Sequence, residues 1–174
     1  GKERAGGVAS VPIDVPTVSE VADVLGRVCN QVNTLVGGKV ITSADQWEFL
    51  WCEPMSRKLD FTRNKPVFKM KVIAPRAGAK VYFKIEPPVL GGNNPPALEV
   101  TEVVTTKAGE WEELVFDFTE LNPGNNLYQK IVLLFDAGEK NAGEVWYFDD
   151  ILCPSDDLTD ICLFQRYEAN PVFE

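Results

Sequence analysis

The chain contains no histidine, and this absence removes several kinds of catalytic and metal site. Ser-His-Asp and Cys-His nucleophile pairs both need an imidazole as the general base. Zinc sites with imidazole ligands are excluded for the same reason. The sequence therefore gives no support to the hydrolase and zinc-enzyme classes that depend on this side chain.

Cysteine is scarce as well, with four residues at positions 29, 52, 153 and 162, none of them in the CxxC spacing of zinc or redox sites. Two interpretations stay open: the thiols are free and behave as small buried hydrophobic groups, or at least one disulfide forms. In the second interpretation Cys153 and Cys162 are the favoured pair, because only eight residues separate them around a turn-like Pro-Ser-Asp-Asp segment.

Long apolar runs are missing too, and the run at residues 131–135 is far too short to cross a bilayer, so no membrane insertion is expected. Residues 1–12 are polar and glycine-rich, and we interpret them as a flexible leader that follows a removed export signal; a lipid anchor upstream stays open. We expect a single domain over residues 13–153. Residues 154–174 are interpreted as an extension that packs on this domain or leads to a further domain of the same protein.

The formal net charge of −9 argues against a nucleic-acid partner, since binding to a phosphate backbone needs clustered Lys and Arg. The charges are unevenly spread: residues 57–84 hold nine basic side chains and one acid, whereas residues 110–174 hold fifteen acids and three basic side chains. One interpretation is that strands from the two regions lie side by side and pair their charges across a sheet surface. The alternative is a polyanion site on the basic segment.

The dominant hydrophobic period is two, which is typical of strands with one buried face. Alternating or β-branched runs predict strands at residues 68–72, 80–86, 97–106, 113–118 and 145–152. Residues 128–136 are apolar on both faces and predict a central strand. Turn signals separate these runs, and residues 87–96, which begin and end with a pair of prolines, predict a loop. The pattern predicts an all-β, antiparallel β-sandwich of the jelly-roll type. Residues 19–30 are predicted as one amphipathic helix, with a strand and its neighbouring turn as the alternative that their β-branched content leaves open.

Four motifs occur in a characteristic order along the chain. They are FKMKV with APRAG at residues 68–78, GEWEELVFDF at 109–118, YQKIVLLFDAG at 128–138 and WYFDDI at 146–151. Over roughly residues 20–153 the sequence resembles the galactose-binding-like β-sandwiches that serve as carbohydrate-binding modules in exported proteins, especially of Bacteroidetes. Two departures are a longer loop at residues 87–96 and Trp146 at a position where Tyr is more common.

The resemblance implies a non-catalytic glycan-binding module of an exported protein, at the cell surface or in the periplasm, with a polysaccharide or other glycan as partner. The alternative is a structural spacer or protein-interaction module with the same fold and no sugar site, because fold alone does not determine function. The resemblance also implies a structural calcium ion near the last strand, with Asp150 as the first ligand and Asp149 as the second. The alternative is that these acids cap backbone N–H groups or face water.

An enzyme is not expected. Glycoside hydrolysis needs two carboxyl groups about 5 to 9.5 Å apart on either side of one bond. Asp149 and Asp150 are neighbours on a predicted strand, so their side chains are expected on opposite faces of the sheet. No other acidic pair is distinguished by its context.

A sugar site pairs a flat aromatic surface with a few hydrogen-bonding groups. If residues 47–53 are extended, Trp47, Phe49 and Trp51 share one face. Either this face enters the core, or at least one Trp stays exposed as a sugar platform, with Arg57 and Lys58 as donors to hydroxyl groups or to an acidic sugar.

Two further aromatic residues are assigned from their places at the starts of strands. Tyr128, beside a predicted Asn-rich loop, is a second platform candidate, and it too has burial in the core as the alternative. Trp111 follows a turn and leads into an alternating strand, so we predict that it seals one end of the core.

Overall fold

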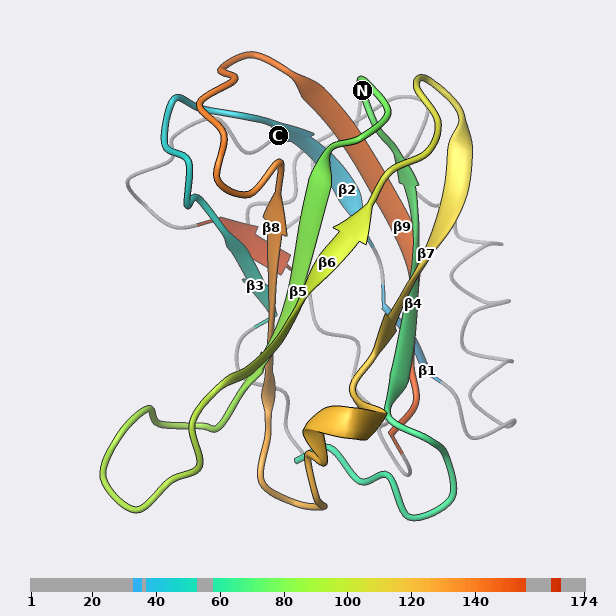
Figure 1. Ribbon diagram of the computed structural model, residues 1–174. Helices are drawn as coiled ribbons and strands as arrows, with labels where there is room; N and C mark the ends of the chain where they lie inside the picture. Colours follow the sequence, from blue (N-terminus) through green and yellow to red (C-terminus); the bar gives the residue numbers. More distant parts are fainter. Residues whose placement is uncertain (1–32, 36, 53–57, 156–163, 167–174) are drawn as a thin grey trace.

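The computed structural model describes residues 33–35, 37–52, 58–155 and 164–166, which form two antiparallel sheets that face each other (Figure 1). Sheet A contains β1 (Asn33–Leu35), β2 (Gly38–Ile41), β9 (Val145–Cys153), β4 (Val67–Ile73) and β7 (Trp111–Asp117). Sheet B contains, in spatial order, β10 (Phe164–Arg166), β3 (Leu50–Cys52), β8 (Lys130–Phe135), β5 (Lys80–Glu86) and β6 (Leu98–Val104). The all-β, antiparallel prediction is confirmed, and the arrangement is compatible with a β-sandwich; the finer assignment to a jelly roll stays a prediction.

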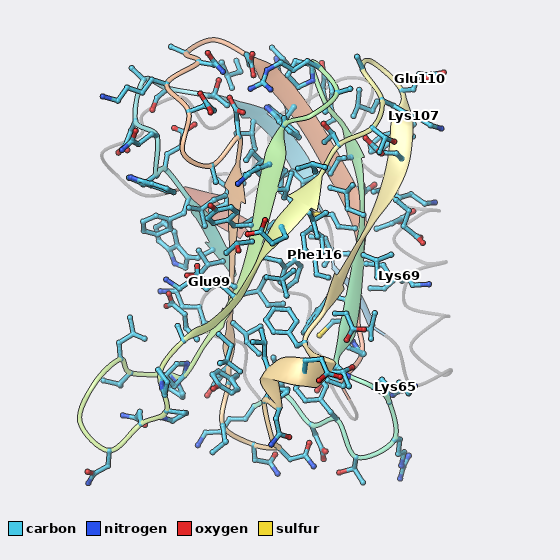
Figure 2. All side chains as sticks on the ribbon, in the orientation of Figure 1. Lys65, Lys69, Glu99, Lys107, Glu110 and Phe116 are labelled. Carbon is cyan, nitrogen blue, oxygen red and sulfur yellow. The ribbon has the colours of Figure 1, made fainter. Side chains whose placement is uncertain are left out.

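The core lies between the sheets and follows the predicted alternation. Phe68, Phe83 and Phe116, from β4, β5 and β7, are fully buried, and the ring of Phe83 lies 4.7 Å from that of Phe68 and 4.9 Å from that of Phe116. Figure 2 shows Phe116 directed into the space between the sheets, with Lys69 pointing outward from β4. The predicted central strand is confirmed, because β8 pairs with β3 on one side and β5 on the other.

A β-bulge in β9 corrects the expectation for the two adjacent aspartates. Lys69 pairs with Leu152 and Lys71 with Asp149, so two residues of β9 lie opposite the single Met70 of β4. Asp150 adopts a left-handed conformation (φ 48°), and the extra residue resets the alternation of the strand. Asp149 and Asp150 are both partly exposed, whereas the residues on either side of them are fully buried. The prediction that their side chains point to opposite faces is therefore wrong.

The prediction that Trp111 belongs to the core is also wrong, since 40% of this residue is exposed. Leu114 and Phe116 point inward, and alternation along β7 then places Trp111 on the outer face of sheet A, opposite Ile73. Its strand neighbour Glu112 holds the preceding turn, since its carboxylate accepts hydrogen bonds from the backbone N–H and the hydroxyl of Thr106, at 2.9 and 2.8 Å.

The predicted pairing of basic and acidic segments is confirmed. Lys71 Nζ lies 3.1 Å from an Asp150 oxygen, and Lys69 Nζ lies 3.8 Å from Glu113. Arg76 bridges Asp136 and Glu144 where β9 begins. Pairs as exposed as Lys69 with Glu113 contribute little to stability, so their main effect is to neutralise the sheet surface.

Some sequence predictions concern residues outside the described ones, namely the leader at residues 1–12, the helix at 19–30, Arg57, Cys29, Cys162 and most of the extension at 154–174. Residues 87–96 form the predicted loop between β5 and β6. No helix in the described part of the chain is long and apolar enough to cross a membrane.

Cys153 is a free thiol in the core, and burial raises its pKa to about 12. The thiolate is the reactive form, so iodoacetamide should leave Cys153 unmodified in the native protein at pH 8 and modify it after denaturation. Peptide mapping by mass spectrometry measures this directly. Rapid labelling of Cys153 in the native protein would contradict the burial.

Gly37 is required by a close backbone contact. A Cβ at this position would lie 1.9 Å from the carbonyl oxygen of Phe148 on β9, and backbone cannot move aside cheaply. Gly37→Ala should therefore lower the free energy of unfolding by about 3 kcal/mol, the upper end of the usual overpacking cost. The matched control is Gly91→Ala, where the added methyl group meets open space. Its only cost is backbone strain at a φ of +85°, which should lower the free energy of unfolding by about 1 kcal/mol. Urea unfolding measures both, and equal losses would contradict the contact.

Candidate functional site

The outer face of sheet B carries a row of paired side chains across four strands. Trp51 of β3 pairs with Val132 of β8, Val132 with Lys84 of β5, and Lys84 with Glu99 of β6. Their strand neighbours Leu50, Leu133 and Phe83 point into the core, so the row faces outward. Figure 2 shows Glu99 on the side of the molecule away from Lys69.

Two further rows lie on either side of this one and give the face a gradient of polarity. Tyr82 of β5 pairs with Leu134 of β8, and at the other end Glu86 pairs with Lys130. Along the hollow, the outward side chains of β5 therefore change from the aromatic Tyr82 to the charged Lys84 and Glu86, and the exposed Lys80 lies on the same face beyond Tyr82, outside the lining. The same alternation that buries Val81, Phe83 and Ile85 places them here.

Trp47 reaches this face from the segment that precedes β3, and half of its surface is exposed (50%). Its backbone N–H donates to the Asp45 carboxylate at 2.9 Å, and the neighbouring Gln46 carbonyl accepts from Gly138 N–H at 2.9 Å. The Trp47 ring lies 6.3 Å from that of Tyr82 with a tilt of 42°. Its position is therefore set by a turn that docks on the β8–β9 loop.

The face carries an open hollow with a volume of about 380 Å³. Its lining combines three aromatic, three charged and two aliphatic residues: Trp47, Phe49 and Tyr82; Lys84, Glu86 and Glu99; Val132 and Leu134. This volume lies within the range of small-molecule sites, and the lining mixes apolar surface with convergent polar groups. The hollow can hold an amphipathic ligand of modest size.

The charged end of the hollow is organised around Glu86, whose side chain is only 8% exposed. Its carboxylate forms ion pairs with Lys84 Nζ at 3.4 Å and with Lys130 Nζ at 3.3 Å. Lys130 Nζ also lies 5.8 Å from the centre of the Trp51 ring, within the range of a cation–π contact. An ammonium group carries three N–H donors, so Lys84 retains donor capacity beyond its bond to Glu86.

The aromatic segment at residues 47–51 keeps its rings on the outer side. Leu50 is buried, Phe49 and Trp51 are half-buried with their rings 5.6 Å apart, and Trp47 is the most exposed. The interpretation in which this aromatic face enters the core is wrong. On the outer side, Val132 and Leu134 provide apolar contacts that remove part of the ring surface from water.

Tyr128, the second platform candidate, lies in the core with 3% of its surface exposed. Its hydroxyl donates to the Pro96 carbonyl at 3.1 Å, and burial raises its pKa. Its ring therefore has no open side on which a sugar could stack. The candidate donor Arg57 lies outside the described residues. Sequence reasoning missed Tyr82, Lys84 and Glu86 as site residues, although the predicted inward alternation of their strand already implied that they face outward.

The two candidate calcium ligands already have partners in the fold. Asp149 accepts a hydrogen bond from Gly37 N–H at 3.1 Å, and Asp150 is paired with Lys71. The Lys71 ammonium would repel a cation at Asp150, so a calcium ion there would require this side chain to move. Among the residues described, no group of three or more His, Cys, Asp or Glu side chains is arranged to hold a metal. Calcium binding stays a prediction of the resemblance.

Neither a protein-family model nor a curated protein matches the chain. The resemblance to galactose-binding-like modules therefore stays a hypothesis.

The two lysines of the charged end should depend on Glu86 for their placement. Glu86→Gln leaves both ammonium groups without their buried counter-charge, and we expect a loss of about 1–3 kcal/mol in the free energy of unfolding. The matched control is Glu113→Gln, which breaks the exposed pair with Lys69 and should change stability by less than about 0.5 kcal/mol. Denaturant unfolding compares the two variants. Indistinguishable losses would show that Glu86 does not organise this end.

Proposed function

We propose that the outer face of sheet B binds a glycan without chemical conversion, in an exported or cell-surface protein. The observation that carries this proposal is the half-exposed Trp47 beside Tyr82 at one end of a hollow whose other end holds Lys84 and two glutamates. Sugars present apolar C–H faces ringed by hydroxyl groups. A flat ring next to donors and acceptors matches both parts of such a ligand.

Each group has a distinct part in this proposal. Trp47 supplies the stacking surface, and Tyr82 closes its side. Lys84 donates to hydroxyl oxygens, and Glu99 accepts from hydroxyl groups at the rim. Glu86 holds Lys84 in place and is engaged by two ammonium groups, so we assign it no role as a proton donor to a glycosidic oxygen.

A glycan microarray followed by affinity measurement on the best ligand tests this function. Trp47→Ala should weaken binding about tenfold or more, because loss of the ring removes about 1.4 kcal/mol or more of stacking and buried area. The matched control is Trp111→Ala, which removes a similarly exposed Trp from the opposite sheet and should leave affinity unchanged. A blank array, or loss of binding in the control alone, would overturn the proposal.

The second candidate is a spacer or protein-interaction module. The outer face of sheet A favours it, because Trp111 pairs there with Ile73, and Ile73 pairs with Tyr147, so that apolar and aromatic side chains lie in one row. A protein interface is typically enriched in such aromatic residues. A blank glycan array would make this candidate the better one.

A further inference from the structure

We infer that the hollow on sheet B takes several units of an uncharged glycan chain, rather than an acidic polysaccharide or a single sugar. This inference rests on the proposed function and adds the charge and the length of the ligand. Two properties of the hollow carry it: the balance of its charges, and the separation of its aromatic and charged ends.

The charges at the hollow cancel. Its lining holds Lys84, Glu86 and Glu99, and Lys130 lies against Glu86 from the neighbouring strand. Two positive and two negative groups leave no excess of cations to receive a carboxylate or a sulfate. An acidic sugar bonded to Lys84 would meet the carboxylates of Glu86 and Glu99, and like charges at close range repel. The net charge of −9 on the chain adds to this repulsion at longer range.

The lining of the hollow runs along β5 for more than the length of one sugar ring. Tyr82 and Glu86 are separated by four residues along β5, which corresponds to about 13 Å in a strand. This is longer than one pyranose ring. A ligand that fills the hollow from Trp47 to the Glu86 end should therefore contain more than one unit, although Lys84 itself lies only about 7 Å along the strand from Tyr82. We expect the Trp47 ring and the Lys84 ammonium group to contact different units of such a chain.

The charge part is tested by calorimetry against neutral chains (a mixed-linkage β-glucan, a xylan and a galactomannan) and acidic chains (polygalacturonate and alginate). We expect binding to a neutral chain only, with an affinity that changes less than about twofold between low salt and about 0.5 M salt, because no net charge is neutralised on binding. Binding to acidic chains alone, lost in high salt, would overturn this inference and leave the proposed function intact. Absence of binding to every carbohydrate tested would overturn both this inference and the proposed function.

The length part is tested with a mono- to tetrasaccharide series cut from the neutral chain that binds. We expect the affinity to rise from the monosaccharide to the trisaccharide and then to level off. A monosaccharide that binds as tightly as the trisaccharide would overturn the inference.

A double-mutant cycle on Trp47→Ala and Lys84→Gln separates the two ends. If they contact different sugar units, their fold-losses in trisaccharide affinity should multiply, since independent sites are additive in free energy. Lys69→Gln on sheet A is the control and should leave affinity unchanged. A double variant no weaker than either single variant would show that both residues act on one unit.

Discussion

The contact of Phe83 with Phe68 and Phe116 joins the two sheets, and the rest of the arrangement depends on it. Because Phe83 points inward, its strand neighbours Tyr82 and Lys84 have to point outward. The same parity applies on β8, where Leu133 is buried and Val132 and Leu134 face the hollow. The binding face is thus a consequence of the core, since one alternation determines both.

Sheet A shows what happens where the alternation is broken. The bulge at Asp150 adds one residue to β9, which lets Phe148 and Ile151 both stay in the core and pushes both aspartates outward. Asp149 then receives the Gly37 N–H, and Asp150 receives Lys71. In the structure, one acid therefore accepts a backbone hydrogen bond and the other forms an ion pair with a lysine. The resemblance implies metal ligation for the same two residues.

The two outer faces differ in shape and in polarity. On sheet B the turn that carries Trp47 rises beside β3 and makes a hollow with charged groups at its far end. On sheet A the pairs of Lys69 with Glu113 and of Lys71 with Asp150 lie beside the row that contains Trp111. An aromatic ring next to donors and acceptors suits a polar ligand with apolar faces, and on sheet B these groups line a hollow.

The strands of the core could be predicted from sequence because their alternation is local: β5 occupies residues 80–86, as its pattern of apolar and polar residues indicates. The alternation along β7 already indicated that Trp111 faces outward. The prediction that it lies in the core followed the general preference of large aromatic residues for the interior, and it was wrong for this reason. The hollow could not be predicted in this way, because Trp47, Lys84 and Lys130 are distant in the chain and meet only through strand pairing and a docked turn. Local periodicity in the sequence thus determined which side chains face outward. Which of these side chains lie together was decided only by the pairing of β3, β8, β5 and β6, because the register between strands depends on contacts across the whole sheet.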